Sequence, residues 1–228
     1  RFTNWQKEGY IPSSEIEEGD KTNELMRTRG WKYWHQLYNP RQLLVHGLFM
    51  KIISEMAESK GKQVVGLLGV NKFCNWNAKL SRWNPGSGVE KVVDTYSNQA
   101  LNTVFDYGSR GFNDLYNLWY FNITNTKIIA NTEITLSDAR NISNKSDLWI
   151  TDPPYADAVN YHELSEFFLA WDKELLKKAF PEWYTDSKRV LAVRGRNETF
   201  KISMIEIYTN LTNHMPDNGM QIIMFTHQ

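Results

Sequence analysis

The pattern of apolar and polar positions predicts a strand–helix–helix–strand unit in the second half of the chain. Residues 148–151 are apolar or β-branched, which is typical of a short strand buried on both faces. Two apolar stripes at helical spacing predict helices over about 160–179 and 200–215, and the first helix is expected to pack on the sheet. After a turn at 216–219, residues 220–226 return as an apolar strand. This order predicts a right-handed α/β crossover with the last strand beside the first.

The first half of the chain is less regular. Residues 1–38 are polar and aromatic with little periodicity, and they indicate an irregular arm. The Asn-Pro pair at 39–40 predicts a helix start with proline in the first turn. The helix is expected to end at Gly61, and its apolar stripe recurs every four residues: Leu44, Leu48, Ile52 and Met56. A second helix is expected over 64–74.

The stretch 75–111 is rich in turn residues and tryptophan. Such an insertion before the strand at 148–151 can hold target-recognition residues or can be a packed structural insertion, and the sequence leaves both open. A short helix is expected over 112–121 and a strand over 128–135. The predicted parts are an irregular arm at 1–38, a helical region with an insertion at 39–126, and an α/β part at 127–228.

Charge and composition narrow the classes of partner. With 26 basic and 26 acidic residues the chain is neutral, whereas nucleic-acid enzymes usually carry a basic patch. Basic residues cluster between 173 and 201, and Arg194 and Arg196 among them are candidates for substrate contact, although a solvated face is the commoner explanation. The one cysteine excludes an internal disulfide, and the five histidines lack metal-ligand spacing, so no metal is expected. Without a signal peptide or an apolar run of about 18 residues, we expect a soluble cytoplasmic protein that contacts no membrane.

The clearest chemical signal is the tetrapeptide Asp152-Pro153-Pro154-Tyr155, which directly follows the apolar strand. Each proline fixes φ at about −65° and lacks an N–H for the strand ladder, so the strand stops there. The residue before each proline is held extended. A carboxylate, a backbone carbonyl and an aromatic ring are therefore fixed at the carboxyl end of a strand, where open α/β sheets bind ligands.

This trio suits a planar aromatic amine, such as the exocyclic amine of adenine or cytosine. Its nitrogen is a poor nucleophile because the lone pair is delocalised into the ring. Asp152 and the Pro153 carbonyl, each accepting one N–H, would draw the nitrogen towards tetrahedral geometry. Tyr155 would stack on the base, a contact worth about 1–3 kcal/mol. A methyl donor on the far side of the nitrogen would complete an in-line transfer.

At these residues the chain resembles the amino-methylating DNA methyltransferases that use S-adenosylmethionine. More closely, it resembles large bacterial and archaeal DNA methylases that carry an N-terminal domain of unknown function, some encoded beside phage-defence genes. The likeness covers most of the chain, through the segments 40–44, 81–83, 155–161, 164–168 and 217–227.

The resemblance implies a partial Rossmann-like methyltransferase sheet in a three-layer α/β/α fold, with a mostly helical or irregular insertion before the catalytic strand. It implies S-adenosylmethionine as cofactor and a flipped DNA base as substrate. An aspartate in the first position favours adenine N6, with cytosine N4 as the other choice. Restriction-modification or phage-defence subunits are the further partners that it implies.

The resemblance also implies site residues outside the tetrapeptide. Asp138, at the end of the preceding predicted strand, is the candidate for contact with the cofactor's adenine, although a turn-forming aspartate is the commoner role. Asp152 is the other candidate cofactor contact. Asn160 and Tyr161 are candidates for lining the base pocket, although core packing is the safer expectation for Tyr161.

One departure from the family concerns the cofactor loop. The glycine-rich loop lies upstream of the tetrapeptide in the family, and the nearest segment here, 66–71, lacks its acidic, glycine-dense turn. We therefore expect an internal piece of a longer enzyme that alone binds cofactor poorly or not at all. Two alternatives stay open: a methyltransferase acting on RNA or a protein amide, and a non-catalytic DNA-binding or scaffold protein that kept the fold.

Overall fold

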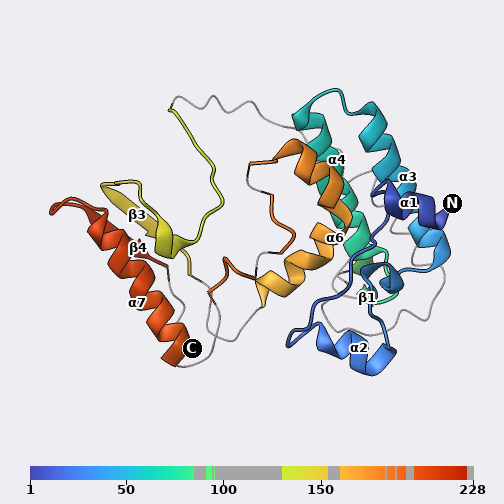
Figure 1. Ribbon diagram of the computed structural model, residues 1–228, viewed down its shortest axis with the longest axis horizontal. Helices are drawn as coiled ribbons and strands as arrows, with labels where there is room; N and C mark the ends of the chain where they lie inside the picture. Colours follow the sequence, from blue (N-terminus) through green and yellow to red (C-terminus); the bar gives the residue numbers. More distant parts are fainter. Residues whose placement is uncertain are drawn as a thin grey trace. The chain divides into compact units, whose positions relative to one another are not determined.

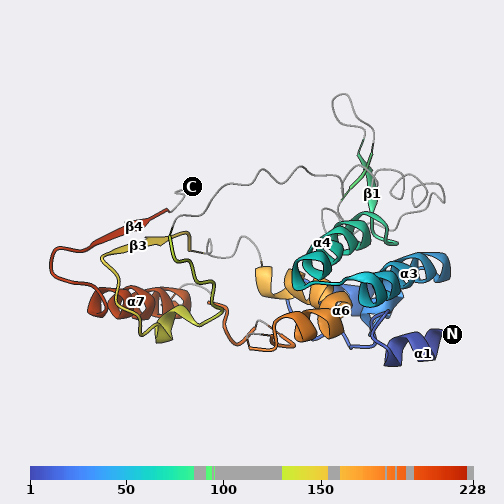
Figure 2. The same ribbon diagram turned by 90° about the horizontal axis from the view of Figure 1, so that it is seen from above.

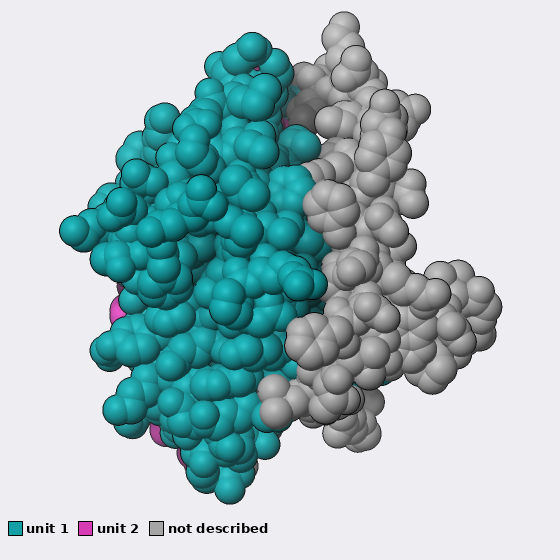
Figure 3. Space-filling model, turned by 90° about the vertical axis from the view of Figure 1, so that its right-hand side faces the viewer, with its two compact units in different colours: residues 1–130, 166–186 teal, residues 131–165, 187–228 magenta. Residues whose placement is uncertain are grey.

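The computed structural model describes residues 1–84, 91–93, 95, 130–153, 160–182, 184–187, 189–193 and 198–224. The chain divides into two compact units, each built from two stretches of sequence. Figure 3 colours the residues of unit 1 teal and those of unit 2 magenta. Unit 1 comprises Arg1–Ala130 and Glu166–Asp186, and unit 2 comprises Asn131–Ser165 and Ser187–Gln228. The described part of unit 1 is mainly helical, whereas the described part of unit 2 includes a pair of parallel strands and a helix (Figures 1 and 2).

Helix α3 (Pro40–Met56) begins where the sequence predicts it. The side-chain oxygen of Asn39 accepts a hydrogen bond from the Gln42 N–H at 2.8 Å, and Gln42 Oε1 accepts one from the Asn39 N–H at 2.9 Å. This reciprocal capping box satisfies two backbone donors of the first turn. The helix ends five residues earlier than expected, because Gly61 belongs to the first turn of α4 (Lys60–Trp76), which Ser59 caps.

The buried face of α3 is not its apolar stripe. The residues that face the core are Gln42, Leu43, His46, Gly47 and Met50. The polar ones find partners there, since Gln42 Nε2 donates to Asn77 Oδ1 at 3.1 Å and His46 Nε2 lies 2.9 Å from the Asn77 carbonyl. Burial lowers the pKa of His46 to about 4, so its imidazole is neutral at physiological pH.

The first 38 residues differ from the predicted irregular arm. They form the short helices α1 (Phe2–Lys7) and α2 (Asn23–Arg29) and a 3-10 helix at Trp34–Leu37. Trp5, Leu25 and Trp34 are buried in the core of unit 1. Each of these short helices contributes only one or two large side chains to the core, so the sequence shows no periodic apolar stripe.

Close packing at Gly47 gives a stability prediction. A Cβ at this position would lie 2.6 Å from Trp5 Cε3 and 3.0 Å from Ile11 Cγ2. We expect Gly47→Ala to lower the free energy of unfolding by about 1–3 kcal/mol through overpacking, despite the better helix propensity of alanine. Urea denaturation measures the change. Gly61→Ala is the matched control, because nothing lies within 4 Å of its added Cβ and it should stabilise α4 slightly. A Gly47→Ala protein as stable as the wild type would contradict the packing.

Helix α6 (Tyr161–Ala179) belongs to unit 1 from Glu166 onward, and this part of the helix completes the core of the unit. Phe167 and Trp171 are buried there beside Tyr38. Trp171 Nε1 donates to the Tyr38 hydroxyl at 3.1 Å, and that hydroxyl donates to the Cys74 carbonyl at 3.3 Å. The helix lies where its spacing predicts, but its buried residues pack among helices rather than on a sheet.

In unit 2, β3 (Leu148–Thr151) and β4 (Met220–Ile223) run parallel, so the predicted pairing of the first and last strands is confirmed. Leu148 pairs with Met220 and Thr151 with Ile223, and α7 (Glu198–Asn213) connects to β4 through a turn closed by the Gly219 N–H and the Pro216 carbonyl at 2.8 Å. The larger Rossmann-like, three-layer sheet stays a prediction.

The expected burial of β3 on both faces is wrong for the described structure. One face of the strand pair is exposed. Its apolar residues are Leu148, Ile150, Met220 and Ile222. The opposite face meets α7, where the Tyr208 hydroxyl lies 3.4 Å from Thr151 Oγ1 and Gln221 Nε2 donates to Thr212 Oγ1 at 2.7 Å. Among the described residues, no second layer of helices covers the exposed face.

Two other segments bear on the predicted organisation. Within the predicted insertion, β1 (Arg82–Asn84) pairs antiparallel with β2 (Lys91–Val93). Residues 130–135 form no strand and are exposed, so the strand expected over 128–135 is wrong for this described part, where the β-branched side chains have no packing surface. The helix expected at 112–121 lies outside the described residues.

Candidate active site

The candidate site begins at the carboxyl end of β3. The Thr151 carbonyl still accepts the Met224 N–H at 2.9 Å, and the strand ends with this residue. Asp152 follows with an exposed side chain, whereas Pro153 is buried. Because proline has no N–H to donate, the ladder cannot continue through Pro153. The carboxylate is therefore presented at the strand edge that usually binds ligands in open α/β sheets.

Several predicted site residues lie outside the described part of the chain. They are Pro154, Tyr155, Arg194 and Arg196. The described half of the tetrapeptide is thus Asp152 and Pro153. Their placement matches the sequence argument for the strand end, and the roles of the stacking ring and of the two arginines stay predictions.

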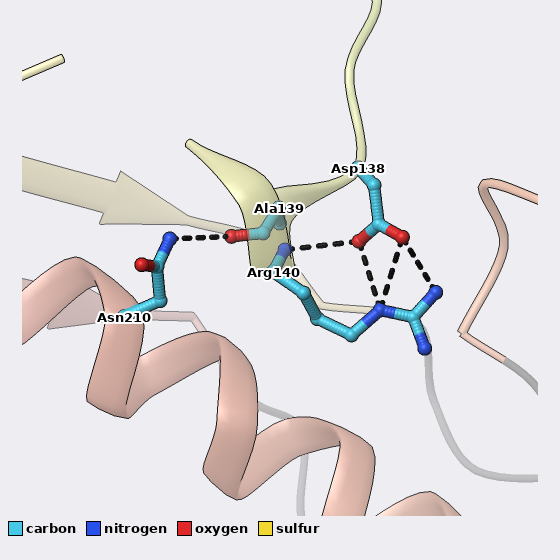
Figure 4. A network of polar contacts seen from close by, with 4 residues as sticks. All are labelled: Asp138, Ala139, Arg140 and Asn210. Carbon is cyan, nitrogen blue, oxygen red and sulfur yellow. Dashed lines mark hydrogen bonds and ion pairs between the residues drawn. The ribbon is translucent and has the colours of Figure 1, made fainter. Parts of the chain in front are cut away.

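Asp138 is engaged within its own turn. It caps a 3-10 helix at Ala139–Asn141, accepting the Arg140 N–H at 2.9 Å, and it forms an ion pair with the Arg140 guanidinium at 2.6 Å (Figure 4). The hydrogen bonds from the Arg140 side chain lower the pKa of Asp138. Asn210 of α7 donates to the Ala139 carbonyl at 3.3 Å and fixes the turn on this helix. The observed contacts are those of a turn-forming aspartate.

Asn160 and Tyr161 stand at the start of α6. The Asn160 carbonyl accepts the Glu163 N–H at 3.0 Å, and Asn160 Nδ2 donates to Glu163 Oε1 at 3.0 Å, so Asn160 organises the first turn of the helix. Tyr161 is 59% exposed, so the expectation that it packs in the core is wrong. Tyr161 lies two residues before the buried Glu163 and so on a different side of the helix, and its exposed ring suits stacking better than packing.

A cavity beside β4 and α7 brings in residues that sequence reasoning missed. It has a volume of about 590 Å³, and its walls are mostly apolar, with Phe200, Met204, Ile205, Tyr208 and Ile223 among them. Tyr208 is also the residue whose hydroxyl contacts Thr151, directly before Asp152. The sequence signal that could have indicated this cavity is an aromatic and apolar repeat at spacings of four: Phe200, Met204 and Tyr208. Ordinary core stripes of helices have the same spacing, so the repeat alone does not mark a cavity.

The segment nearest to a cofactor loop is part of a helix. Residues 66–71 lie in the middle of α4, where their backbone N–H groups belong to the helix ladder. Gly69 is buried in this helix, and a Cβ on Gly66 would meet Ile53 at 2.8 Å. These glycines therefore permit close helix packing rather than a phosphate- or ribose-binding turn. In the described ranges, no group of three or more His, Cys, Asp or Glu gathers as a metal site.

No family model, no curated protein and no solved structure matches this chain. None of the helices that the structure describes combines the length and the apolar character needed to cross a membrane. The assignment of function therefore depends on the residues at the end of β3 and on the chemistry that they permit.

Proposed function

We propose that this chain belongs to an S-adenosylmethionine-dependent methyltransferase that acts on the exocyclic amine of a DNA base, with adenine N6 preferred. The observation that carries the proposal is the exposed Asp152 carboxylate, held between a parallel strand and a buried proline at the carboxyl end of β3. Asp152 and the Pro153 carbonyl accept the two N–H bonds of the amine. These acceptors stabilise the positive charge that develops on nitrogen as the methyl group is transferred.

In this proposal Asp152 and Pro153 belong to the amine-binding half of the site. The described residues do not fit the cofactor half, because residues 66–71 are helical and Asp138 is paired with Arg140. When bound, S-adenosylmethionine supplies the methyl group. We assign its binding to no described residue.

A DNA base lies inside the helical stack, so the substrate must be flipped out to reach a carboxylate on a sheet edge. Flipping costs a few kcal/mol, which stacking on an aromatic side chain offsets. Tyr155, next to the prolines in sequence, is the proposed stacking residue, and the outward Tyr161 is a second aromatic candidate.

The test is transfer of a labelled methyl group by the full-length protein to DNA, RNA and protein in parallel reactions. We expect incorporation into DNA, with N6-methyladenine found when the digested nucleosides are analysed by mass spectrometry. Incorporation into RNA or protein instead would favour the other methyltransferase class. DNA binding without incorporation into any polymer would favour a non-catalytic protein, the alternative that the helical state of residues 66–71 supports.

A further inference from the structure

Among the residues that the structure describes, helix α3 carries an apolar stripe that no other element covers. Leu44, Leu48, Ile52 and Met56 recur every four residues, and their exposed fractions are 37%, 42%, 46% and 70%. The opposite face of the same helix is buried in unit 1 through Leu43, His46 and Met50. A continuous apolar row on a helix is normally covered by another surface, as the opposite face of α3 is. The stripe is therefore a surface that needs a partner.

The charges at the two ends of the stripe indicate which partner fits. Arg41 precedes Leu44 by three residues and Leu48 by seven, so it lies on the same face, in the first turn of the helix. Glu55 follows Leu48 by seven residues and lies on this face in the last turn. Both are exposed. Arg41 thus lies just before the stripe, and Glu55 lies beside its last residue, Met56.

These two charges oppose the dipole of an isolated α3. The amino end of a helix carries partial positive charge and the carboxyl end partial negative charge, so a cation in the first turn and an anion in the last turn are each unfavourable. An intrahelical ion pair with Lys51 compensates Glu55 in part. An antiparallel neighbouring helix with the same sequence reverses both effects, because its carboxyl end then lies beside Arg41 and its amino end beside Glu55.

We propose that the stripe of α3 is an isologous interface between two copies of this chain, with the two α3 helices antiparallel. With Leu48 at the two-fold axis, Leu44 faces Ile52 of the second copy and Arg41 faces its Glu55. One apolar row and two symmetry-related ion pairs then form from a single helix face. The interface uses residues of unit 1 alone and does not depend on the proposed methyltransferase activity.

The first measurement is the mass of the protein by sedimentation velocity from low to high micromolar concentration. We expect a concentration-dependent dimer. Leu48→Glu should weaken it by on the order of 100-fold or more, because every dimer would bury two copies of the new charge. Leu68→Glu is the matched control, since Leu68 of α4 is 59% exposed and lies outside the stripe. Circular dichroism confirms that each variant is folded.

A charge exchange tests the antiparallel geometry. Arg41→Glu and Glu55→Arg should each weaken the dimer by roughly tenfold, and the double variant should restore it, because the exchanged pair is again complementary. Leu48→Cys should form a disulfide-linked dimer on mild oxidation, since the axis brings the two cysteines together, whereas the native Cys74 is buried.

Three results would overturn the proposal. They are a wild-type protein that stays monomeric at high concentration, a dimer that survives Leu48→Glu, and a charge exchange that fails to restore association. A monomer whose thermal stability falls in Leu48→Glu but not in Leu68→Glu would show that another part of the same chain covers the stripe.

Discussion

Asp152→Asn is expected to lower the rate of methyl transfer by about 10²–10³-fold while leaving the fold and the thermal midpoint unchanged. Asparagine keeps the size of the side chain and one acceptor oxygen but removes the negative charge that stabilises the developing cation on nitrogen. The side chain of Asp152 is exposed, so no core contact is lost. The rate is measured with the full-length protein and the DNA substrate in single-turnover assays.

Asp147→Asn is the matched control for this variant. Asp147 is an exposed carboxylate at the opposite end of the same strand, where its backbone carbonyl accepts the Met220 N–H at 3.0 Å. We expect Asp147→Asn to retain the wild-type rate. A wild-type rate in Asp152→Asn would remove this carboxylate from the chemistry, and an equal loss in both variants would show a general effect of charge.

Asp172→Asn is expected to stabilise the protein at neutral and alkaline pH. Asp172 of α6 is 6% exposed; its Oδ2 accepts from Asn71 Nδ2 at 2.8 Å, and its Oδ1 is buried with no hydrogen-bond partner among the described residues. Burial raises the pKa of Asp172 from 3.8 to about 7, although the Asn71 hydrogen bond opposes the change. The carboxyl group is therefore protonated in the folded state at mildly acidic pH.

The sign of the pH dependence follows from this pKa. Between pH 3.8 and about 7 the folded chain holds a proton that the unfolded chain has released, so stability falls as pH rises through this window. The loss amounts to roughly 4 kcal/mol above pH 7. Cys74 and Tyr184 are the neighbouring titratable groups, and both stay neutral there because burial raises their pKa values.

Urea denaturation at pH 4 and at pH 8 measures the effect. Asp172→Asn mimics the neutral acid, so we expect its stability to equal that of the wild type at pH 4 and to exceed it by several kcal/mol at pH 8. Asp186→Asn is the control, because the hydrogen bond from Tyr184 lowers the pKa of this exposed carboxylate. Removing the negative charge of Asp186 should therefore not stabilise the folded protein. An unchanged pH dependence in Asp172→Asn would show that Asp172 is ionised in the folded state.

The elements with strong local signals could be predicted from sequence. The cap at Asn39, the periodicity of α6 and α7, and the proline stop after β3 each depend on residues adjacent in the chain. The parallel pairing of β3 with β4 followed from the order of elements between them. The strand end that presents Asp152 was therefore accessible without coordinates.

The errors arise where distant residues decide the outcome. His46 and Gln42 are buried because Asn77, more than thirty residues away, supplies their hydrogen-bond partner, and this reverses the face of α3 that hydrophobicity favours. Likewise, Trp171 packs against Tyr38 rather than against a sheet. At the site, Tyr208 was missed because its contact with Thr151 depends on how α7 crosses β3.

The sharing of α6 between the two units has a practical consequence for dividing the gene. A fragment that begins at residue 131 would retain Asp152, but it would leave Phe167 and Trp171 without Tyr38 and expose them to water. A fragment that ends at residue 130 would lack the same two side chains and contain a hole in its interior. We therefore expect a cut at residue 130 to disrupt the core of unit 1, so the two stretches of each unit have to stay in one polypeptide.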